Sequence, residues 1–423
     1  MAYRIAFLSR LAPLPMHSKL FGIEYLSRGG YEVFFLDLSG LLDGLNAPPV
    51  IQKQDVINDC EIIVISRLEE LDAFVKEGFG NTIFIDCVAG LAEFDLNTGR
   101  IFKLLKKYNA KYYIISNGSI PSDHQDGADV SAGLIFRIKK ALMKPRLLLK
   151  FFVRKSLVHL IKRGYFYQKP LRILGIKDSP IVIGYLKKYG MSSSTITPIN
   201  SHDYDTYLEY KNKTGGAGTS SEICVFLDED YTNHPDYSIF GIVPLNETEY
   251  ISSMNKFFDS VEKQTGLSVV IAAHPKSSFN SENHPYGNRV FTKGDTVRLV
   301  EKSALVIAHS STSISYPVLF RKPIVLAVTK EMQSRAAMID AVRAFARELE
   351  LTVIDVDSNE ESWSFDSAME RHREYTRYLF RYVRNIEPVN KILGETIADV
   401  ARDDLPHLEL EKKELYEGHT SDQ

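Results

Sequence analysis

Short apolar runs alternate with helix-compatible stretches along this chain of 423 residues, and no other feature constrains its fold as strongly. In the first half, the runs with strand character are 3–9, 31–39, 61–67, 82–88 and 111–117, followed by weaker candidates at 179–184 and 194–200. Continuous apolar runs separated by helices are typical of a parallel sheet that is covered on both faces. The first half therefore predicts a Rossmann-like α/β domain.

A second series of the same kind begins after residue 221. Its strand candidates are 222–228, 267–273, 304–310, 323–328 and 351–356. The stretch KNKTGGAGTSS at 211–221 separates the two series, and its glycine, serine and threonine content predicts a linker. We therefore expect one Rossmann-like domain over 1–210, a second over 222–365, C-terminal helices over 366–402 and a flexible tail over 403–423.

Composition narrows the classes of function. The chain has 51 Lys and Arg against 54 Asp and Glu, and this balance gives no support for a nucleic-acid-binding role. Its cysteines, Cys60, Cys87 and Cys224, lie far apart without zinc-site spacing, which is typical of reduced thiols in the cytoplasm. We see neither a signal peptide nor an apolar run long enough to span a membrane. A cytoplasmic protein without a metal or cofactor is expected.

Polar residues gather where the strands of the second series end. Ligands of such sheets bind at the carboxyl ends of the strands. The acidic group Asp228, Glu229 and Asp230 follows the first strand, and His274, Pro275 and Lys276 follow the second. The third strand leads into a hydroxyl cluster made of Ser310, Ser311, Thr312 and Ser313. We therefore expect the chemistry of the protein at this edge.

The hydroxyl cluster opens a predicted helix, whose free N–H groups and partial positive charge suit a phosphate. Plain capping is the alternative, although a cap needs only one hydroxyl. His274 has a side chain that donates to a phosphate or protonates a leaving group near neutral pH. Pro275 holds it in an extended conformation, and Lys276 adds positive charge.

His-Pro dipeptides are not rare in this chain, since His234-Pro235 and His284-Pro285 also occur. A turn histidine without a ligand is therefore the alternative for His274. His284 has no strand before it, so His274 is favoured as the functional histidine. In the acidic group, crowding is expected to raise one pKa into the range of a general base, and a solvated acidic turn is the alternative.

The order of acidic cluster, His-Pro and Ser/Thr cluster resembles the bacterial sialyltransferases and related capsule glycosyltransferases of the GT-B fold. Those families carry a D/E-D/E-G motif, an HP motif and a paired Ser/Thr motif. The resemblance implies two Rossmann-like domains that face a cleft, the first for the acceptor and the second for a nucleotide sugar, with C-terminal helices packing back on the first. It also implies that His274 and Ser310–Thr312 engage the donor phosphate, while an acidic residue is the base.

Two departures from the family pattern concern the base. Asp230 stands where the family motif has glycine, and the acidic cluster lies in the second domain rather than the first. A base from the first domain is therefore an open alternative to Asp228, Glu229 and Asp230. Its candidates are the polar residues at or near strand ends there, namely Asp37, Asp86, Asp123, His124 and Asp126.

The resemblance implies an inverting glycosyltransferase of bacterial surface-polysaccharide synthesis, such as capsule or lipopolysaccharide. Its preferred donor is a CMP-linked nonulosonic acid, and its acceptor is a glycan or a lipid-linked glycan. A UDP-sugar transferase, a polyol-phosphate transferase of the teichoic acid kind and a non-catalytic sugar-nucleotide-binding assembly protein are the alternatives. The segment 139–172 carries eleven Lys and Arg among apolar residues, which predicts peripheral contact with an anionic membrane. A cationic helix on its own sheet is the competing interpretation.

Overall fold

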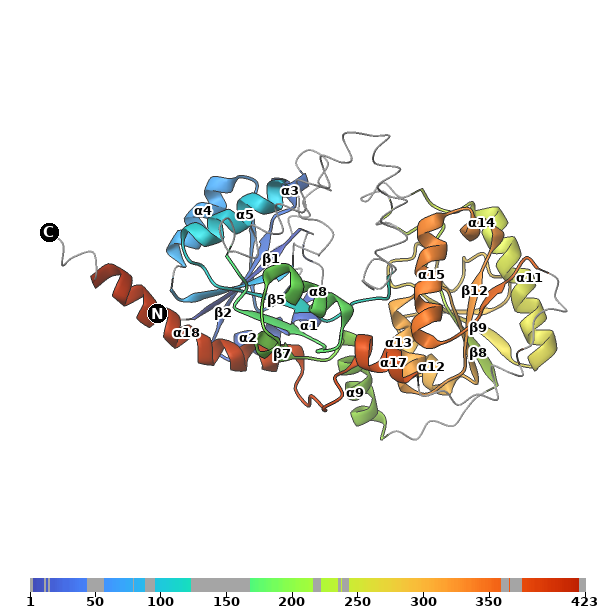
Figure 1. Ribbon diagram of the computed structural model, residues 1–423. Helices are drawn as coiled ribbons and strands as arrows, with labels where there is room; N and C mark the ends of the chain where they lie inside the picture. Colours follow the sequence, from blue (N-terminus) through green and yellow to red (C-terminus); the bar gives the residue numbers. More distant parts are fainter. Residues whose placement is uncertain are drawn as a thin grey trace, which may run out of the picture. The chain divides into compact units, whose positions relative to one another are not determined.

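The computed structural model describes residues 3–417 except 11–12, 14–15, 44–56, 79, 88–95, 123–167, 216–221, 235–236, 238–242, 359–364 and 366–374. The described part contains two parallel sheets with helices, so the predicted α/β class with two Rossmann-like domains is confirmed (Figure 1). Each domain has its own core.

The first sheet has seven strands in the order β3-β2-β1-β4-β5-β6-β7, and every neighbouring pair is parallel. Its strands are β1 (Arg4–Ser9), β2 (Glu32–Asp37), β3 (Glu61–Val64), β4 (Thr82–Cys87), β5 (Tyr112–Ser116), β6 (Arg172–Gly175) and β7 (Ile196–Pro198). The helices of this unit are α1 (Met16–Phe21), α2 (Ile23–Arg28), α3 (Ser39–Asp43), α4 (Leu68–Glu77), α5 (Leu96–Lys107), α8 (Pro180–Tyr189), η3 (Ser193–Thr195) and α18 (Leu393–Glu417). Alternate residues of each central strand enter separate cores on the two faces.

The second sheet has six parallel strands in the order β10-β9-β8-β11-β12-β13. Its strands are β8 (Ile223–Leu227), β9 (Ser268–Ala273), β10 (Val290–Lys293), β11 (Leu305–Ala308), β12 (Ile324–Val328) and β13 (Val353–Asp355). The helices with it are α9 (His202–Thr214), α11 (Glu247–Thr265), α12 (Thr296–Lys302), η4 (Thr312–Ile314), α13 (Ser315–Leu319), α14 (Lys330–Gln333), α15 (Ala336–Leu349), α17 (Thr376–Tyr378) and the π-helical turn η6 (Leu379–Val383).

The strand expected at 179–184 is wrong, because this stretch begins helix α8. Ser179 precedes Pro180, whose fixed φ suits the first helical position, and Gly190 ends the helix at a φ of 61°. Val182, Tyr185 and Tyr189 are buried at helical spacing. An apolar run of five residues fits a strand and a buried helix equally well, so the periodicity alone could not decide. The short strand β10 was not predicted.

The division between the two compact units also differs from the expected boundary at 210. It falls between Asn200 and Ser201, because α9 packs against α12 and α13 of the second unit. Helix α9 extends to Thr214, so the first positions of the expected linker at 211–221 are helical. The chain returns to the first unit at Glu387, which assigns α17 and η6 to the second unit and α18 to the first.

Helix α18 packs back on the first unit beside α2, as expected for the C-terminal helices (Figure 1). Two glycines allow this approach, since a Cβ on Gly22 would lie 2.5 Å from the Cα of Gly394. The helix runs to Glu417, so the flexible tail expected from residue 403 is wrong over most of its length. Leu405 is fully buried in the core beneath the sheet, which explains why the helix persists.

Asp404 ties this helix to the sheet. Its carboxylate accepts two hydrogen bonds from the Arg172 guanidinium at 2.6 Å and a third from the Tyr113 hydroxyl at 2.6 Å. A bidentate arginine–carboxylate pair of this kind is strong when it is partly buried. The charges compensate one another only while both partners are present.

Replacing Asp404 by alanine is expected to lower the free energy of unfolding by about 2–3 kcal/mol, because Arg172 loses its compensating charge. Urea unfolding followed by circular dichroism measures this change. The neighbouring exposed Asp403→Ala is the matched control and should shift the free energy by less than about 0.5 kcal/mol. Equal effects of the two variants would contradict the role assigned to Asp404.

Candidate active site

The candidate site lies at the carboxyl edge of the second sheet. Strand β8 lies between β9 and β11, and all three run parallel, so the loops that follow them emerge at one edge. The backbone N–H of Asp228 still donates to the carbonyl of Ala272 at 3.0 Å. The acidic group therefore starts where the pairing with β9 ends. These polar residues are placed by strand register.

Glu229 joins the end of β8 to the end of β11. Its Oε1 accepts from the backbone N–H of Ser310 at 2.7 Å, and its Oε2 accepts from the Ser310 hydroxyl at 3.2 Å. The Tyr231 hydroxyl donates to the same Oε2 at 2.8 Å. Burial raises the pKa of Glu229 to about 7, although these hydrogen bonds lower it. The sequence correctly predicted a raised carboxyl pKa here, but burial rather than crowding is the main cause.

Asp228 and Asp230 each bury one carboxylate oxygen, Oδ2, that accepts no hydrogen bond within the described part of the chain. The other oxygen of Asp228, Oδ1, accepts from the Asp230 N–H at 3.0 Å and from the Tyr286 hydroxyl at 3.1 Å. Burial raises the pKa of Asp228 to about 6. A buried carboxylate oxygen without a donor is costly, so both Oδ2 atoms are suited to a ligand hydroxyl.

Asp230 adopts a φ of 50°, in the left-handed region that glycine enters at least cost. This is the position where the D/E-D/E-G motif has glycine. The backbone turn thus keeps the conformation that a glycine would favour, and aspartate is one of the side chains that tolerate it best. The solvated acidic turn considered from the sequence is wrong, because Asp228 and Asp230 are 4% and 2% exposed.

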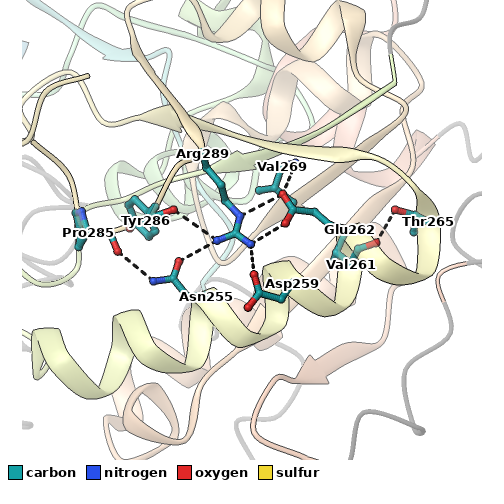
Figure 2. Close-up of polar contacts among 9 residues, drawn as sticks. All are labelled: Asn255, Asp259, Val261, Glu262, Thr265, Val269, Pro285, Tyr286 and Arg289. Carbon is teal, nitrogen blue, oxygen red and sulfur yellow. Dashed lines mark hydrogen bonds and ion pairs between the residues drawn. The ribbon is translucent and has the colours of Figure 1, made fainter. Parts of the chain in front are cut away.

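Tyr286 is held in place by a network around Arg289 (Figure 2). The Arg289 guanidinium binds Glu262 at 2.8 and 3.2 Å, Asp259, and the amide oxygen of Asn255 at 3.2 Å, all on α11. Its Nη1 also donates to the Tyr286 carbonyl at 3.5 Å. Arg289 therefore anchors the loop before β10 to α11, and this loop supplies the hydroxyl that reaches Asp228.

The turn after β9 orients the His274 ring. The backbone N–H of Lys276 donates to its Nδ1 at 3.2 Å, and the N–H of Ser277 donates to the His274 carbonyl at 3.0 Å. The Lys293 ammonium reaches the Ser277 carbonyl at 2.6 Å and steadies the turn from β10. A neutral ring that accepts at Nδ1 carries its proton on Nε2. The ring thus presents an N–H donor on the side away from its own turn.

The Nε2 of His274 lies 3.4 Å from the Nε2 of His234, with ring centroids 4.5 Å apart. His234 belongs to the loop after β8 and was passed over in the sequence as one more His-Pro dipeptide. Its place four positions after Asp230, in the polar stretch that follows β8, was the signal that could have marked it. By contrast, His284 stacks on Phe291 at 4.8 Å beside β10.

His274 and Ser310–Thr312 do not follow adjacent strands, because β8 separates β9 from β11. The residues of the hydroxyl cluster also differ in their hydrogen-bond partners. Ser310 binds Glu229, whereas Ser311 caps the following turn by accepting from the Ser313 N–H at 3.2 Å. Thr312 is exposed and Ser313 is half-buried. Capping thus accounts for Ser311.

His309, next to the cluster, is structural. Its Nδ1 donates to the Ala327 carbonyl at 2.6 Å, and the Tyr250 hydroxyl donates to its Nε2 at 2.9 Å. Burial lowers the pKa of this ring to about 4. It therefore stays neutral and locks β11 to β12 and α11.

In the first unit, Asp37 ends β2 and is fully buried, with Oδ1 accepting from the Ser39 N–H at 2.9 Å. Asp86 lies inside β4 rather than at its end, and its charge contributes to the raised pKa values of Tyr112, Tyr185 and Tyr189 after burial. Asp123, His124 and Asp126 lie outside the described residues, as does most of 139–172.

Within the described ranges, no group of three or more histidine, cysteine or acidic side chains is placed to hold a metal ion. The helices of the same described part include none that is long and apolar enough to cross a membrane. The three cysteines are free thiols.

No protein-family model matches the sequence, and no curated protein matches it. Among solved structures, the wall teichoic acid polymerase TagF with one histidine replaced by alanine is similar with a TM-score of 0.53 and 9% identity, covering 96% of this chain and 89% of that one. The glycosyltransferase of kitacinnamycin (TM-score 0.44, 11% identity, 97% and 96% coverage) and the UDP-GlcNAc 2-epimerase of Methanocaldococcus jannaschii (TM-score 0.46, 11% identity, 95% and 99% coverage) are more distant. The similarity to TagF and the two parallel sheets define a GT-B fold.

The raised pKa of Glu229 has a consequence for stability. A carboxyl whose pKa rises from 4.5 to about 7 on folding stabilises the folded state at acidic pH, and this contribution is lost as the pH rises through about 7. Between about pH 5 and pH 8, this carboxyl should therefore lower the unfolding free energy of the parent by about 2 kcal/mol. The variant Glu229→Gln has no titrating group at this position, so its unfolding free energy should change by about 2 kcal/mol less over the same range.

Urea unfolding at the two pH values measures the difference, and the exposed Glu222→Gln is the control. If Glu229→Gln kept the full pH dependence of the parent, the carboxyl would not titrate as its buried position requires.

Proposed function

We propose that the protein is a glycosyltransferase that moves a sugar from a nucleotide donor to a glycan hydroxyl with inversion. The observation that carries this proposal is the convergence of His274, His234 and the buried carboxylates at the carboxyl edge of one parallel sheet. In a GT-B fold, this edge of the second domain is where the resemblance expects the nucleotide sugar. Two unsatisfied carboxylate oxygens and an oriented imidazole N–H suit a ligand that carries both hydroxyls and phosphate.

The chemistry requires three events. The bond between the anomeric carbon and the phosphate oxygen breaks, a bond to the acceptor oxygen forms, and the acceptor proton passes to a base. The Nε2–H of His274 donates to the departing phosphate and stabilises its charge. Lys276 adds positive charge beside it, and Thr312 and Ser313 of the hydroxyl cluster are further donors to the ligand in this proposal.

A CMP-linked nonulosonic acid is the preferred donor, because the motif order resembles enzymes that use one. A second candidate is transfer of a polyol phosphate from a CDP donor, and the similarity to TagF favours it. In that reaction the acceptor oxygen attacks phosphorus instead of carbon, so phosphate appears in the product. UDP-sugar transfer and a non-catalytic binding role are the remaining alternatives.

Asp228 is the preferred base. Its Oδ2 accepts no hydrogen bond from the residues that the structure describes, and a carboxyl with a pKa of about 6 is ionised at neutral pH yet still basic. Glu229 already receives three hydrogen bonds, which suits a structural role. Asp37 is the candidate from the first unit. A lipid-linked acceptor and peripheral membrane contact through 139–172 stay predictions of the sequence.

Replacing His274 by alanine is expected to lower kcat by about 10²–10³-fold, because one donor to the leaving phosphate is lost. The measurement is turnover with CMP-linked nonulosonic acid, CDP-glycerol and UDP-sugars in parallel, with the phosphate content of the product recorded. The matched control is His284→Asn, which keeps an acceptor for the Tyr286 N–H that His284 Nδ1 binds at 3.3 Å.

The control should retain turnover within about twofold, since His284 lies beside β10 and takes no part in the proposed chemistry. Turnover of His274→Ala near that of the parent, with the donor that works best, would contradict the role of His274. Absence of transfer and of binding for all of these donors would overturn the proposed function itself.

The base is tested by Asp228→Asn and Asp37→Asn. Loss of a general base typically costs about 10²–10⁴-fold in rate, and the variant should also lose the acidic limb of the pH profile of kcat/KM. That limb should fall near pH 6 in the parent if Asp228 is the base. Loss of the limb in Asp37→Asn, with Asp228→Asn unaffected, would transfer the role to the first unit.

A further inference from the structure

The two histidines at the edge of the second sheet form a pair whose reactive nitrogens face each other. His234 follows β8 and His274 follows β9, and their Nε2 atoms are 3.4 Å apart with the rings inclined at 60°. Both side chains are half-buried, so solvent and a ligand reach them. The contact joins two loops that only the pairing of β8 with β9 brings together.

One proton is shared in this arrangement. Because the Lys276 N–H donates to Nδ1 of His274, the neutral His274 ring carries its proton on Nε2. That N–H points to the Nε2 of His234, which then accepts with its lone pair. A His234 ring that accepts at Nε2 carries its own proton on Nδ1.

A second proton between the rings would be unfavourable without a ligand. Two N–H donors at this separation oppose each other, because each presents a partial positive charge to the other. An anionic oxygen that accepts from both nitrogens removes this penalty. Without the additional proton, His234 would have to move its own proton from Nδ1 to Nε2 before it could donate to the anion.

Charged residues near the pair include some that favour an additional proton on it and some that disfavour one. Lys276 lies two positions after His274, and positive charge near the pair disfavours a further proton. The ring of Tyr237 lies 5.5 Å from His234, and burial together with the charges of Glu229, Asp230 and Asp228 raises the pKa of Tyr237. These carboxylates precede His234 in the same loop, and negative charge near the pair favours its protonated form.

We propose that His234 and His274 form a phosphate clamp that takes up one proton from solvent when a nucleotide phosphate binds. In the free protein the pair holds one N–H between its two Nε2 atoms. In the complex each Nε2 carries a proton and donates to a phosphate oxygen, and no covalent bond other than the new N–H changes. The inference deepens the proposed function and rests on it for the identity of the ligand as a nucleotide.

Isothermal calorimetry with CMP and with CDP, in two buffers of different ionisation enthalpy at about pH 8, counts the protons. The second pKa of a phosphate monoester is about 6, so the ligand is fully ionised there. The parent should take up close to one proton, and its Kd should rise about tenfold per pH unit. The variant His234→Gln keeps a polar atom near Nε2 but does not titrate, so its uptake should fall to near zero.

The matched control is again His284→Asn. His284 also precedes a proline and accepts at Nδ1 from the residue two positions on, yet its ring stacks on Phe291 instead of facing an imidazole. It should keep the proton uptake of the parent. Uptake by His234→Gln equal to that of the parent, or nucleotide binding by the parent without uptake, would overturn the clamp.

Failure of the proposed function can be distinguished from failure of the phosphate clamp. If neither nucleotide binds the parent, the proposed function fails, and inorganic pyrophosphate in the same calorimetry decides the clamp by itself: uptake that depends on His234 supports it, and any other result overturns it. If His234→Gln does not fold, the histidine ¹⁵N shifts of the parent replace it. Added pyrophosphate should then convert His234 to the doubly protonated form, while His274 keeps its single proton on Nε2, and an unchanged His234 would refute the proposal.

Discussion

The position of β8 between β9 and β11 is the constraint on which the candidate site depends. Parallel pairing aligns the carboxyl ends of these strands, and the residues that follow them come within hydrogen-bond distance of one another. Because of this alignment, Glu229 accepts a hydrogen bond from the Ser310 N–H, and the ring of His234 contacts the ring of His274. A shift of β8 by one residue would turn the opposite face of the strand to the core and separate these partners.

The site brings together groups that are costly to bury. Asp228, Glu229 and Asp230 lie in one turn, and burial raises the pKa values of Asp228 and Glu229. Hydrogen bonds from Tyr231, Tyr286 and the backbone of Ser310 offset part of this cost. The surrounding core of the second unit includes residues from β8, β9 and β11. Groups held in such an environment are those whose pKa values suit acid–base chemistry.

The three His-Pro dipeptides of the chain show how tertiary context divides one motif into different roles. His274 follows a central strand and is oriented by its own turn, whereas His284 packs flat against Phe291. His234 has the same dipeptide, and it is distinguished only by its contact with the ring of His274. The network around Arg289 also depends on tertiary contacts (Figure 2). Through Arg289, α11 positions Tyr286, whose hydroxyl donates to Asp228 although the two residues are distant in the sequence.

The sequence by itself determined the two parallel sheets, most of their strands and the polar strand ends, because apolar runs and local polarity are properties of neighbouring residues. It also marked Asp228, Glu229, His274 and Ser310. Only the tertiary structure decided that α8 is a helix, that α18 continues beyond residue 403, and that β8 separates β9 from β11. These outcomes depend on contacts between distant segments, such as Arg172 with Asp404 and Gly22 with Gly394. The partner of His274 was hidden for the same reason, because strand order is set by packing and leaves no local signal.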